Sequence, residues 1–355
     1  MTTPRERALS HLRVLDLGGG ASELATRLMG DMGADVILVE PPGGVRSRAD
    51  GPFQGDKPNP DRSLKFIANN ANKRSVVLDL SSPEDRDVVR DLAARSDVLV
   101  ESFTPSYLPS IGLGFEDLTT ISPGLVYASL SPFGQDGPYR DFAATELTIQ
   151  SLAGDGWVYG DDEREPCLIP GDATERVGSM HLVLGTLFAL RSRRWSGRGQ
   201  HVDVSRHDVG VWQLVSGSLS RISLRNEVYR RPGKASTGVG SIYRCADGIV
   251  QFFPATPQQF RNMVTKWMQD KTFDDPVWDD PDFRRDNWDV VDAHVTAYLA
   301  DKRVADVEQQ VFEADFPMAP MSTMAEFVNH PHTVARGFIV EQEDPNIGRH
   351  RAPAA

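Results

Sequence analysis

The sequence predicts an α/β protein in which a large domain with a mostly parallel β-sheet is joined to a smaller α+β domain. Two observations lead to this fold class. Through residues 13–130, short β-type runs alternate with segments of helical spacing, as in repeated β–α–β units. After residue 205 the pattern changes, and a hairpin signal and further helical segments follow. The alternation in the first region predicts helices on both faces of the sheet.

The elements of the first region can be assigned in chain order. The β-type runs cover residues 13–17, 35–40, 75–80, 97–101 and 125–130. Residues 22–32 have helical spacing, and Ser82 followed by Pro83 indicates the cap and the first position of another helix. Residues 179–190 are apolar nearly all round, which predicts a buried helix. A glycine-rich turn then leads into a β-type run that ends at Ser205.

The second region has the composition of a small α+β domain. Residues 206–235 begin with a helical pattern and then become polar and basic. Asp247-Gly248 separates two β-type runs, which is a hairpin signal. Tryptophan-containing helical segments follow over residues 258–268 and 287–299. We therefore expect an antiparallel hairpin packed with helices in this part of the chain.

Charge and composition exclude several classes of protein. The formal net charge of −12 argues against nucleic acid as a partner, because binding to a phosphate backbone needs a basic surface. No apolar run approaches the roughly 20 residues that a membrane span requires, and the N-terminus does not resemble an export signal. The two cysteines, Cys167 and Cys245, form no disulfide framework and have no metal-ligand spacing. We expect a cytoplasmic protein without a metal.

The turns after the predicted strands are the expected ligand-binding positions, because ligands of parallel sheets bind beyond the carboxyl ends of the strands. Four polar or glycine-rich turns occupy these positions, at residues 18–20, 41–44, 102–103 and 131–134. The first turn, together with Glu40 at the end of the second strand, suggests a dinucleotide site. The third glycine of that motif is missing, which disfavours a nucleotide-dependent oxidoreductase.

Two carboxylates stand where the apolar helix should begin. Asp172 and Glu175 precede residues 179–190. An acid at such a position can cap the helix by accepting backbone N–H groups, and the helix dipole favours it. A carboxylate can also be a nucleophile that forms a covalent acyl intermediate. From spacing alone, the cap is the commoner role of an aspartate, and both interpretations stay open.

Seven segments in order resemble the class III coenzyme A transferases, the family of formyl-CoA and carnitine-CoA transferases and of α-methylacyl-CoA racemase. The segments are residues 12–44, 72–85, 96–118, 127–141, 196–205, 243–252 and 330–353. The resemblance implies a Rossmann-like large domain, a small domain and an interlocked homodimer. It places the large domain at residues 1–205, linker helices and the small domain at 206–325, and a C-terminal segment returning to the large domain at 326–355.

The chemistry implied by the resemblance is transfer of CoA between an acyl-CoA thioester and a free carboxylic acid. A family aspartate attacks the thioester, and the reaction passes through an anhydride and an enzyme–CoA thioester. No permanently bound cofactor is expected, since coenzyme A and acyl-CoA are substrates. The family's CoA contacts, together with the strand-end turns, give these candidate binding residues: Gly19, Glu40, Lys73, Arg74, Ser102, Phe103 and Gly134.

Several of these candidates also have a purely structural interpretation. Lys73 and Arg74 are equally typical of a solvated strand end. Phe103 could pack against adenine, although an aromatic at such spacing is more often a core residue. Gly134 fits a turn better than a close approach of substrate. Ser102 and Ser110 stand where family members often have an asparagine and a phosphate-binding arginine.

The family's catalytic position can be aligned in two ways. Without gaps, Met180-His181-Leu182 places it at Glu175, whereas Asp172 needs a three-residue slip. A third alternative is that neither is catalytic. The chain would then be a non-catalytic CoA-binding subunit that partners a paralogue in a heteromer, which the short C-terminus also favours. An acyl-CoA isomerase or epimerase of the same fold remains a further alternative, although residues 144–156 lack the histidine of the racemase branch.

Overall fold

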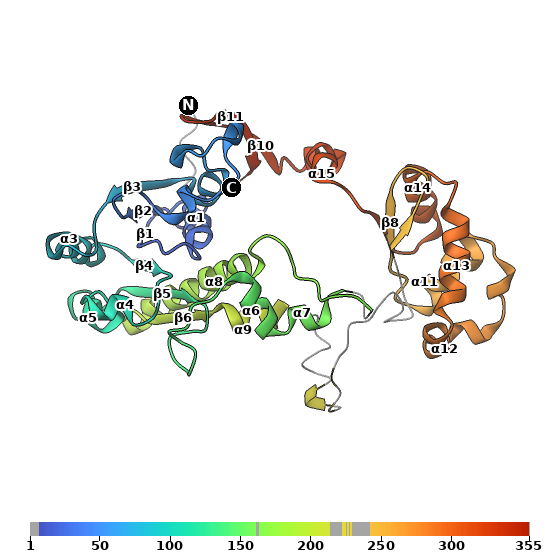
Figure 1. Cartoon of the computed structure of the whole chain (residues 1–355), viewed down its shortest axis with the longest axis horizontal. Coiled ribbons are helices and arrows are strands. Elements are labelled where there is room, and N and C mark those ends of the chain that lie inside the picture. Colours follow the sequence, from blue (N-terminus) through green and yellow to red (C-terminus); the bar gives the residue numbers. More distant parts are fainter. Residues whose placement is uncertain are drawn as a thin grey trace. The chain divides into compact units, whose positions relative to one another are not determined.

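The structure is a computed structural model that describes residues 7–160, 163–213 and 242–354, with 222–224, 226 and 228. The chain divides into two compact units (Figure 1). Unit 1 comprises Met1–Gly156, Leu168–Glu227 and Ile339–Ala355, and unit 2 comprises Trp157–Cys167 and Val228–Phe338. The basic residues predicted after residue 213, among them Arg221, Arg225, Arg230 and Arg231, lie outside the described residues.

Unit 1 is built on a six-stranded sheet in the order β3-β2-β1-β4-β5-β6, and every pair of neighbouring strands is parallel. The strands are β1 (Arg13–Asp16), β2 (Asp35–Glu40), β3 (Lys73–Val77), β4 (Val98–Glu101), β5 (Val126–Ser131) and β6 (His201–Ser205). A parallel sheet needs both faces covered, and the central strands β4 and β5 are accordingly buried along their whole length. This sheet confirms the predicted α/β class and the mostly parallel arrangement.

The helices of unit 1 cover the two faces of the sheet. They are α1 (Glu23–Asp31), α2 (Leu64–Asn70), α3 (Pro83–Ala94), α4 (Tyr107–Ser110), α5 (Phe115–Ile121), α6 (Glu146–Ala153), α8 (Ala173–Ser196) and α9 (Arg206–Gln213). The short α7 (Asp155–Val158) begins in unit 1 and ends in unit 2. One core joins α1 and α8 to strand residues such as Val14 and Val100. The other joins α3, α4 and α5 to strand residues such as Leu15 and Leu99. Successive residues of one strand therefore serve opposite cores, as the period of two requires.

Most local predictions for unit 1 are confirmed. The Ser82 hydroxyl accepts the Asp85 N–H at the start of α3, and Pro83 occupies its first turn. The third strand, predicted at 75–80, is β3 at Lys73–Val77, because its pairing with β2 already begins at Lys73.

The prediction of a wholly buried helix over residues 179–190 is wrong. That segment belongs to the longer α8, and one side of the helix is exposed in the single chain, at Met180, Leu184 and Phe188. The apolar positions on the other side, such as Leu182, face the sheet. Apolar residues on all sides of a helix indicate that each side packs against something. They do not show whether the partner of the second side is in the same chain.

Unit 2 has an antiparallel three-stranded sheet, β7-β8-β9, with helices packed against it. Its elements are β7 (Ile242–Arg244), β8 (Ile249–Phe252), β9 (Met318–Pro320), α11 (Pro257–Arg261), α12 (Pro281–Asp286), α13 (Trp288–Leu299), α14 (Val304–Ala314), α15 (Met324–Asn329) and α16 (Pro331–Ala335). The β7–β8 pair confirms the hairpin predicted at Asp247-Gly248. Phe252, Phe260 and Trp267 belong to its aromatic-rich core.

The C-terminal hairpin of β10 (Ile339–Asp344) and β11 (Gly348–Pro353) belongs to unit 1. The Gln54 side chain donates to the Ile347 carbonyl at 2.9 Å, which attaches the hairpin turn to unit 1. The described residues contain no helix long and apolar enough to cross a membrane.

Candidate active site

The two predicted catalytic carboxylates line one cavity of unit 1, which we call the α8 cavity. It has a volume of about 440 Å³. Its walls come from the turn after β1 at Gly19, the turn after β4 at Ser102 and Phe103, and the beginning of α8 at Asp172 and Glu175. The site therefore lies beyond the carboxyl ends of parallel strands, where ligands of such sheets bind.

Asp172 occupies the N-cap position of α8 without acting as a cap. Its backbone is in the left-handed region, with φ of 54°, and its side chain accepts no helix N–H group. Instead, Asp172 Oδ2 lies 3.0 Å from Lys65 Nζ, and this lysine lies 3.7 Å from Asp50. Burial lowers the pKa of Lys65, but the hydrogen bond and charge of Asp172 outweigh it, so this pKa lies above its usual value. Asp172 is thus an ion-paired side chain at the cavity wall.

Glu175 lies in the first turn of α8 and is more deeply buried than Asp172. Its side chain is 26% exposed, against 38% for Asp172. Glu175 Oε1 lies 3.2 Å from Arg206. Burial raises the pKa of Glu175 above its usual value, although the charge of Arg206 opposes this rise. Glu175 is consequently a weakly solvated carboxyl whose charge one buried cation partly balances.

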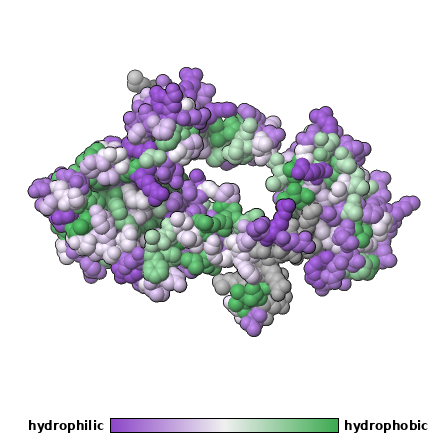
Figure 2. Space-filling view, in the orientation of Figure 1, coloured by the Kyte–Doolittle hydropathy of each residue, from purple (hydrophilic) through white to green (hydrophobic). Residues whose placement is uncertain are grey.

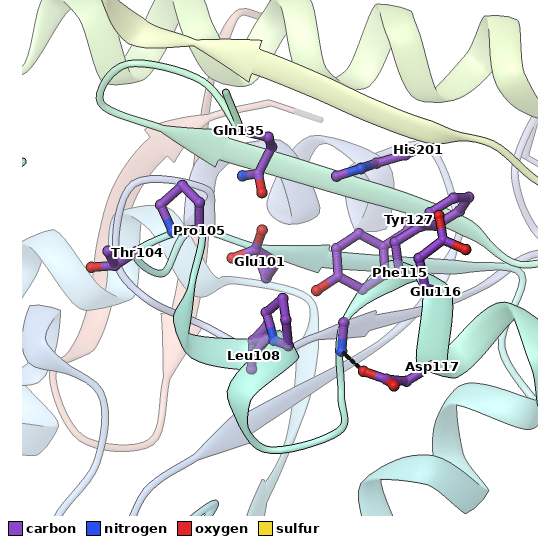
Figure 3. Close-up of a pocket in the computed structure, with 12 residues that line it drawn as sticks. Glu101, Thr104, Pro105, Leu108, Phe115, Glu116, Asp117, Tyr127, Gln135 and His201 are labelled. Carbon is purple, nitrogen blue, oxygen red and sulfur yellow. Dashed lines mark hydrogen bonds between the residues drawn. The ribbon is translucent and has the colours of Figure 1, made fainter. Parts of the chain in front are cut away.

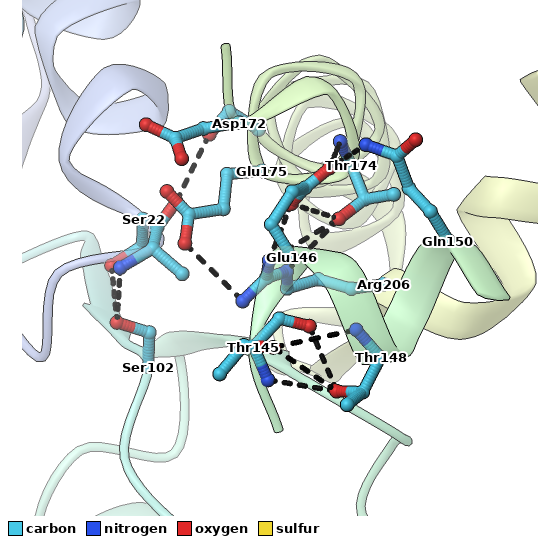
Figure 4. A network of polar contacts seen from close by, with 12 residues as sticks. Ser22, Ser102, Thr145, Glu146, Thr148, Gln150, Asp172, Thr174, Glu175 and Arg206 are labelled. Carbon is cyan, nitrogen blue, oxygen red and sulfur yellow. Dashed lines mark hydrogen bonds and ion pairs between the residues drawn. The ribbon is translucent and has the colours of Figure 1, made fainter. Parts of the chain in front are cut away.

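Arg206 joins Glu175 to a second carboxylate, Glu146 (Figure 4). Its guanidinium lies 2.7 Å from Glu146 Oε2 and 3.2 Å from Thr174 Oγ1. Burial raises the pKa of Glu146, but hydrogen bonds from Thr174, Gln150 and Arg206 bring it below its usual value. Glu146 is therefore the ionised partner that holds Arg206, and the longer contact to Glu175 is the second interaction of the same guanidinium.

Sequence reasoning missed the charged partners of the two carboxylates, Lys65, Glu146 and Arg206. For one of them, Arg206, the sequence does contain a positional signal. Arg206 follows the last residue of β6 directly, at the carboxyl end of a parallel strand, where functional side chains gather in this class of fold. Lys65 and Glu146 reach the cavity from α2 and from the start of α6, and no motif marks them.

Gly19 and Ser102 shape the floor of the α8 cavity. The Ser102 hydroxyl accepts the Ala21 N–H at 3.2 Å and donates to the Gly18 carbonyl at 3.1 Å. Gly19 has a φ of 97°, and a Cβ there would lie 2.6 Å from Ser102 Oγ. Only glycine allows both this backbone conformation and this close contact.

Lys73 supports this floor from below and does not face a ligand. Its side chain is 2% exposed, and its Nζ lies 2.9 Å from Asp16 Oδ2, 2.9 Å from the Glu23 carbonyl and 2.6 Å from Asn70 Oδ1. All three ammonium donors are thus used within the protein. Asp16 in turn accepts the Gly18 N–H at 2.9 Å, so the ion pair fixes the start of the glycine turn.

The remaining predicted residues fall into two groups. Phe103 lines the α8 cavity, whereas Glu40, Arg74 and Gly134 line none of its walls in the described structure. Glu40 forms a close ion pair with Arg48, and Arg74 pairs with Asp35. The Gly134 N–H donates to Ser131 Oγ at 3.0 Å, so this glycine serves the turn after β5. The structure thus brings together Gly19, Ser102, Phe103, Asp172 and Glu175.

A second cavity of about 290 Å³, which we call the Arg46 cavity, adjoins the first. Gly19, Arg46 and Phe103 line both. Its other walls are mostly apolar ends of the strands, such as Leu17 and Leu78, and the Phe103 ring lies 5.2 Å from that of Tyr107. Arg46 has no carboxylate partner within the described part of the chain. The apolar, aromatic-lined Arg46 cavity thus lies beside the cavity that holds the carboxylates of α8. Among the described residues, no cluster of side chains has the composition of a metal site.

Comparison with known proteins places this geometry in a family. Residues 9–355 match the family described as CoA-transferase family III. The chain is 30% identical over 349 residues to succinyl-CoA–D-citramalate CoA-transferase of Chloroflexus aurantiacus, covering 96% of the chain and 85% of the relative. It is 34% identical over 266 residues to succinate–glutarate CoA-transferase of Agrobacterium fabrum, covering 73% of the chain and 66% of the relative.

A solved structure agrees with these relatives. The chain is similar to a CaiB/BaiF family protein from Brucella suis, with a TM-score of 0.85 and 26% identity over 99% of this chain and 92% of the other. The similarity covers the whole chain, as the ordered motifs of the sequence predicted. The chain belongs to CoA-transferase family III, and it is a transferase.

Proposed function

We propose that this protein moves CoA between an acyl-CoA thioester and a free carboxylic acid through a covalent intermediate on Glu175. The observation that carries this proposal is the position of the Glu175 carboxyl, half-buried in the α8 cavity between the glycine turn and Arg206. Partial removal from water strengthens a carboxylate as a nucleophile, and the charge of Arg206 opposes the rise in the Glu175 pKa that burial causes.

In the first half-reaction, a Glu175 oxygen attacks the thioester carbonyl and the CoA thiolate leaves, which forms a mixed anhydride. The thiolate then attacks the glutamyl carbonyl, releases the donor acid and leaves a glutamyl–CoA thioester. The acceptor carboxylate attacks this thioester, and the second half-reaction repeats the two steps in reverse. No atom or electron pair has to be supplied from elsewhere.

The glycine turn supplies the donors for the oxyanions of these steps. The N–H groups of Gly18 and Ala21 already donate to Asp16 and to Ser102. Gly19 and Gly20 line the α8 cavity, and no group within the described residues accepts from their N–H groups, which can therefore donate to a developing negative charge.

CoA occupies the two adjoining cavities in this proposal. The adenine lies in the apolar Arg46 cavity near Phe103 and Tyr107, and the thioester lies in the α8 cavity. Arg46, which lines both, takes a phosphate group, since a guanidinium suits phosphate oxygens. We leave Lys73, Arg74 and Glu40 out of the CoA site, because each is occupied by a partner within the protein.

The acid partner is a dicarboxylic acid. Several relatives are named for such acids, among them D-citramalate, glutarate and oxalate. Arg140 lines the α8 cavity, and within the described part of the chain its only ion pair is with the adjacent Asp141, at 3.2 Å. One carboxylate of the acid reacts at Glu175 while Arg140 binds the other, because a guanidinium can hold both oxygens of a carboxylate.

Two copies of the chain associate through the exposed side of α8. Four large apolar residues at helical spacing lie there uncovered: Met180, Leu184, Phe188 and Trp195. Figure 2 shows apolar surface, in green, over the part of unit 1 around α6 and α8. An apolar surface of this kind is typical of an interface between chains. Light scattering of the protein and of Phe188→Glu tests this, and the substitution should shift the mass toward the single chain.

Covalent trapping tests the proposed nucleophile. The full-length protein is incubated with succinyl-CoA, quenched with hydroxylamine and digested with trypsin. The peptide of residues 165–176 contains both Asp172 and Glu175, so fragment ions between these positions must assign the hydroxamate. We expect it on Glu175, retained in Asp172→Asn and absent from Glu175→Gln.

A second candidate function is a CoA-binding subunit of a heteromeric transferase. It is favoured by the existing ion pair between Glu175 and Arg206, and several relatives are named as subunits. The same trapping experiment separates the two functions. Binding of succinyl-CoA without any trapped peptide supports the subunit and contradicts the nucleophile.

A further inference from the structure

A third cavity of unit 1 is not used by the proposed reaction. It has a volume of about 190 Å³ and is lined by residues of β4, α5, β5 and β6 (Figure 3). We call it the Glu101 cavity after the buried carboxyl that lines it. Thr104 and Pro105 line both this cavity and the α8 cavity, so the segment after β4 lies between them.

Three rings form one side of the Glu101 cavity. The rings of Phe115 and His201 stack with centroids 5.2 Å apart, and Tyr127 meets the His201 ring edge-on, also at 5.2 Å. The Tyr127 hydroxyl donates to the Leu113 carbonyl at 3.3 Å, which holds the ring in place. Burial lowers the pKa of His201, although Asp203 and Glu116 oppose this, so the imidazole is neutral at pH 7. The wall is therefore aromatic and uncharged.

The polar groups of the cavity include three carboxyls and one amide, besides the Thr104 hydroxyl and the polar atoms of Tyr127 and His201. Glu101 is 3% exposed, and its Oε2 accepts the Phe103 N–H at 2.7 Å. Every other charged side chain of the lining is also acidic, namely Glu116 and Asp117. Gln135 Nε2, a donor, is buried without a partner in the described structure, and the amide oxygen is the atom of this side chain that can accept from a ligand. Figure 3 shows the Gln135 amide and the Glu101 carboxyl pointing toward one another across the cavity.

We infer that the Glu101 cavity binds a small organic cation, a protonated amine whose ammonium group donates to the Glu101 carboxylate and to the Gln135 amide oxygen. Its apolar part lies against Phe115 and Tyr127, whose ring faces attract positive charge. A buried carboxylate without a cation is costly, and a bound ammonium compensates that cost. An anion is disfavoured by the three carboxyls of the lining. The ligand is thus of a different class from the acyl-CoA and the acid of the proposed reaction.

The binding of a cation depends on pH through Glu101. Burial raises the pKa of Glu101 to about 7, Asp203 on β6 adds to the rise, and hydrogen bonds from Ser129 and from the Phe103 N–H oppose it. The other groups that face it across the cavity are His201 and Tyr127 on the strands, and Glu116 and Asp117 on α5. A cation binds the ionised form, so its affinity should increase about tenfold between pH 6 and pH 8, in proportion to the ionised fraction.

Calorimetric titration of the full-length protein with benzylammonium tests the inference. Benzyl alcohol, which has almost the same shape without the charge, is the matched ligand control. We expect saturable binding of benzylammonium that is about tenfold tighter at pH 8 than at pH 6, and at least tenfold weaker binding of the alcohol. Absence of saturable binding at pH 8, or equal binding of the two ligands, would overturn the inference.

Variants locate the site. Glu101→Gln should weaken benzylammonium at least tenfold at pH 8 and remove the pH dependence. Glu343→Gln, which makes the same charge change at an exposed position on β10, should leave the affinity unchanged. Phe115→Leu should weaken the ligand while keeping the pH dependence, and it decides the matter if Glu101→Gln does not fold. Unchanged affinity in folded Glu101→Gln or in Phe115→Leu contradicts the inference.

Discussion

Two ion pairs of unit 1 differ in what surrounds them. The pair of Lys73 and Asp16 lies beneath the glycine turn, with side chains 2% and 0% exposed, and every donor of the ammonium group has an acceptor. The pair of Arg206 and Glu175 lies at the start of α8, with side chains 6% and 26% exposed, and it faces the α8 cavity. Both combine a cation and a carboxylate on one sheet-based scaffold.

The difference in enclosure separates an ion pair that supports the backbone from one that can meet a substrate. A fully enclosed and fully satisfied pair holds backbone in place, because breaking it leaves a buried charge alone. A pair with one side open to a cavity can exchange its partner for a substrate group. Lys73 therefore belongs to the frame of the site although its sequence context resembles a CoA contact, and Glu175 is the carboxylate that we propose for the reaction. Substitutions at the two pairs should affect different measurements.

The largest expected effect is that of Glu175→Gln on turnover. The amide keeps the shape of the side chain and removes the nucleophile, so kcat should decrease more than about a thousandfold, as when other covalent nucleophiles are removed. Initial rates of CoA exchange between succinyl-CoA and glutarate measure this, with the melting temperature as the control for folding. Near-normal turnover would assign the reaction to another group.

Lys73→Met should change stability rather than chemistry. Removing one member of a buried pair costs about 3–5 kcal/mol, because Asp16 is left charged and enclosed. Urea unfolding of the protein and of the variant measures this cost. The double variant Lys73→Met with Asp16→Asn should recover part of it, since the lone charge is gone. A cost below about 1 kcal/mol would show that the pair is not a support of the glycine turn.

Arg206→Gln should change the pH dependence of the rate. Burial already raises the pKa of Glu175 and the charge of Arg206 lowers it, so the loss of Arg206 raises this pKa further. The nucleophile must be ionised, and the acid limb of the rate profile should consequently move to higher pH. The ion pair with Glu175 is treated as an interaction between charged groups of about 1.5–3 kcal/mol, and its loss predicts a decrease of roughly 10- to 150-fold at pH 7.

Arg206→Lys is the matched control for this experiment. It keeps the charge, so the acid limb should stay near its original pH, although a single ammonium group cannot hold Glu146 and Glu175 in the same geometry. If both variants lose the same activity without any shift of the profile, Arg206 serves the fold alone.

The sheet could be predicted from the sequence because a parallel strand covered on both faces is a continuous apolar run. β2 and β5 have this pattern and were placed within one residue. β3 was placed two residues late, since it begins with Lys73 and Arg74, and one of these charges is enclosed by side chains from elsewhere in the chain. The local sequence around Lys73 does not show that distant side chains will enclose its charge.

The site could be predicted only in part for the same reason. Asp172 and Glu175 are visible because they precede an apolar helix, and the strand-end turns mark Gly19, Ser102 and Phe103. The assignment of a partner to each carboxylate depends on contacts between distant segments, which bring Lys65 to Asp172 and Arg206 to Glu175. Spacing along the chain does not predict such contacts.

The smallest expected effect is that of Asp172→Asn, which adds a solvent-exposed ion pair to the two pairs compared above. The ion pair of Asp172 and Lys65 is open to solvent, with side chains 38% and 31% exposed, and exposed pairs contribute about 0.2–1 kcal/mol. Stability should change by less than about 1 kcal/mol, and turnover should stay within about fivefold of the original, which is the same free energy expressed as a rate. Urea unfolding and the CoA-exchange assay measure the two quantities. Loss of turnover comparable to that of Glu175→Gln would instead make Asp172 the nucleophile, and an open ion pair with a lysine would then be the reactive one.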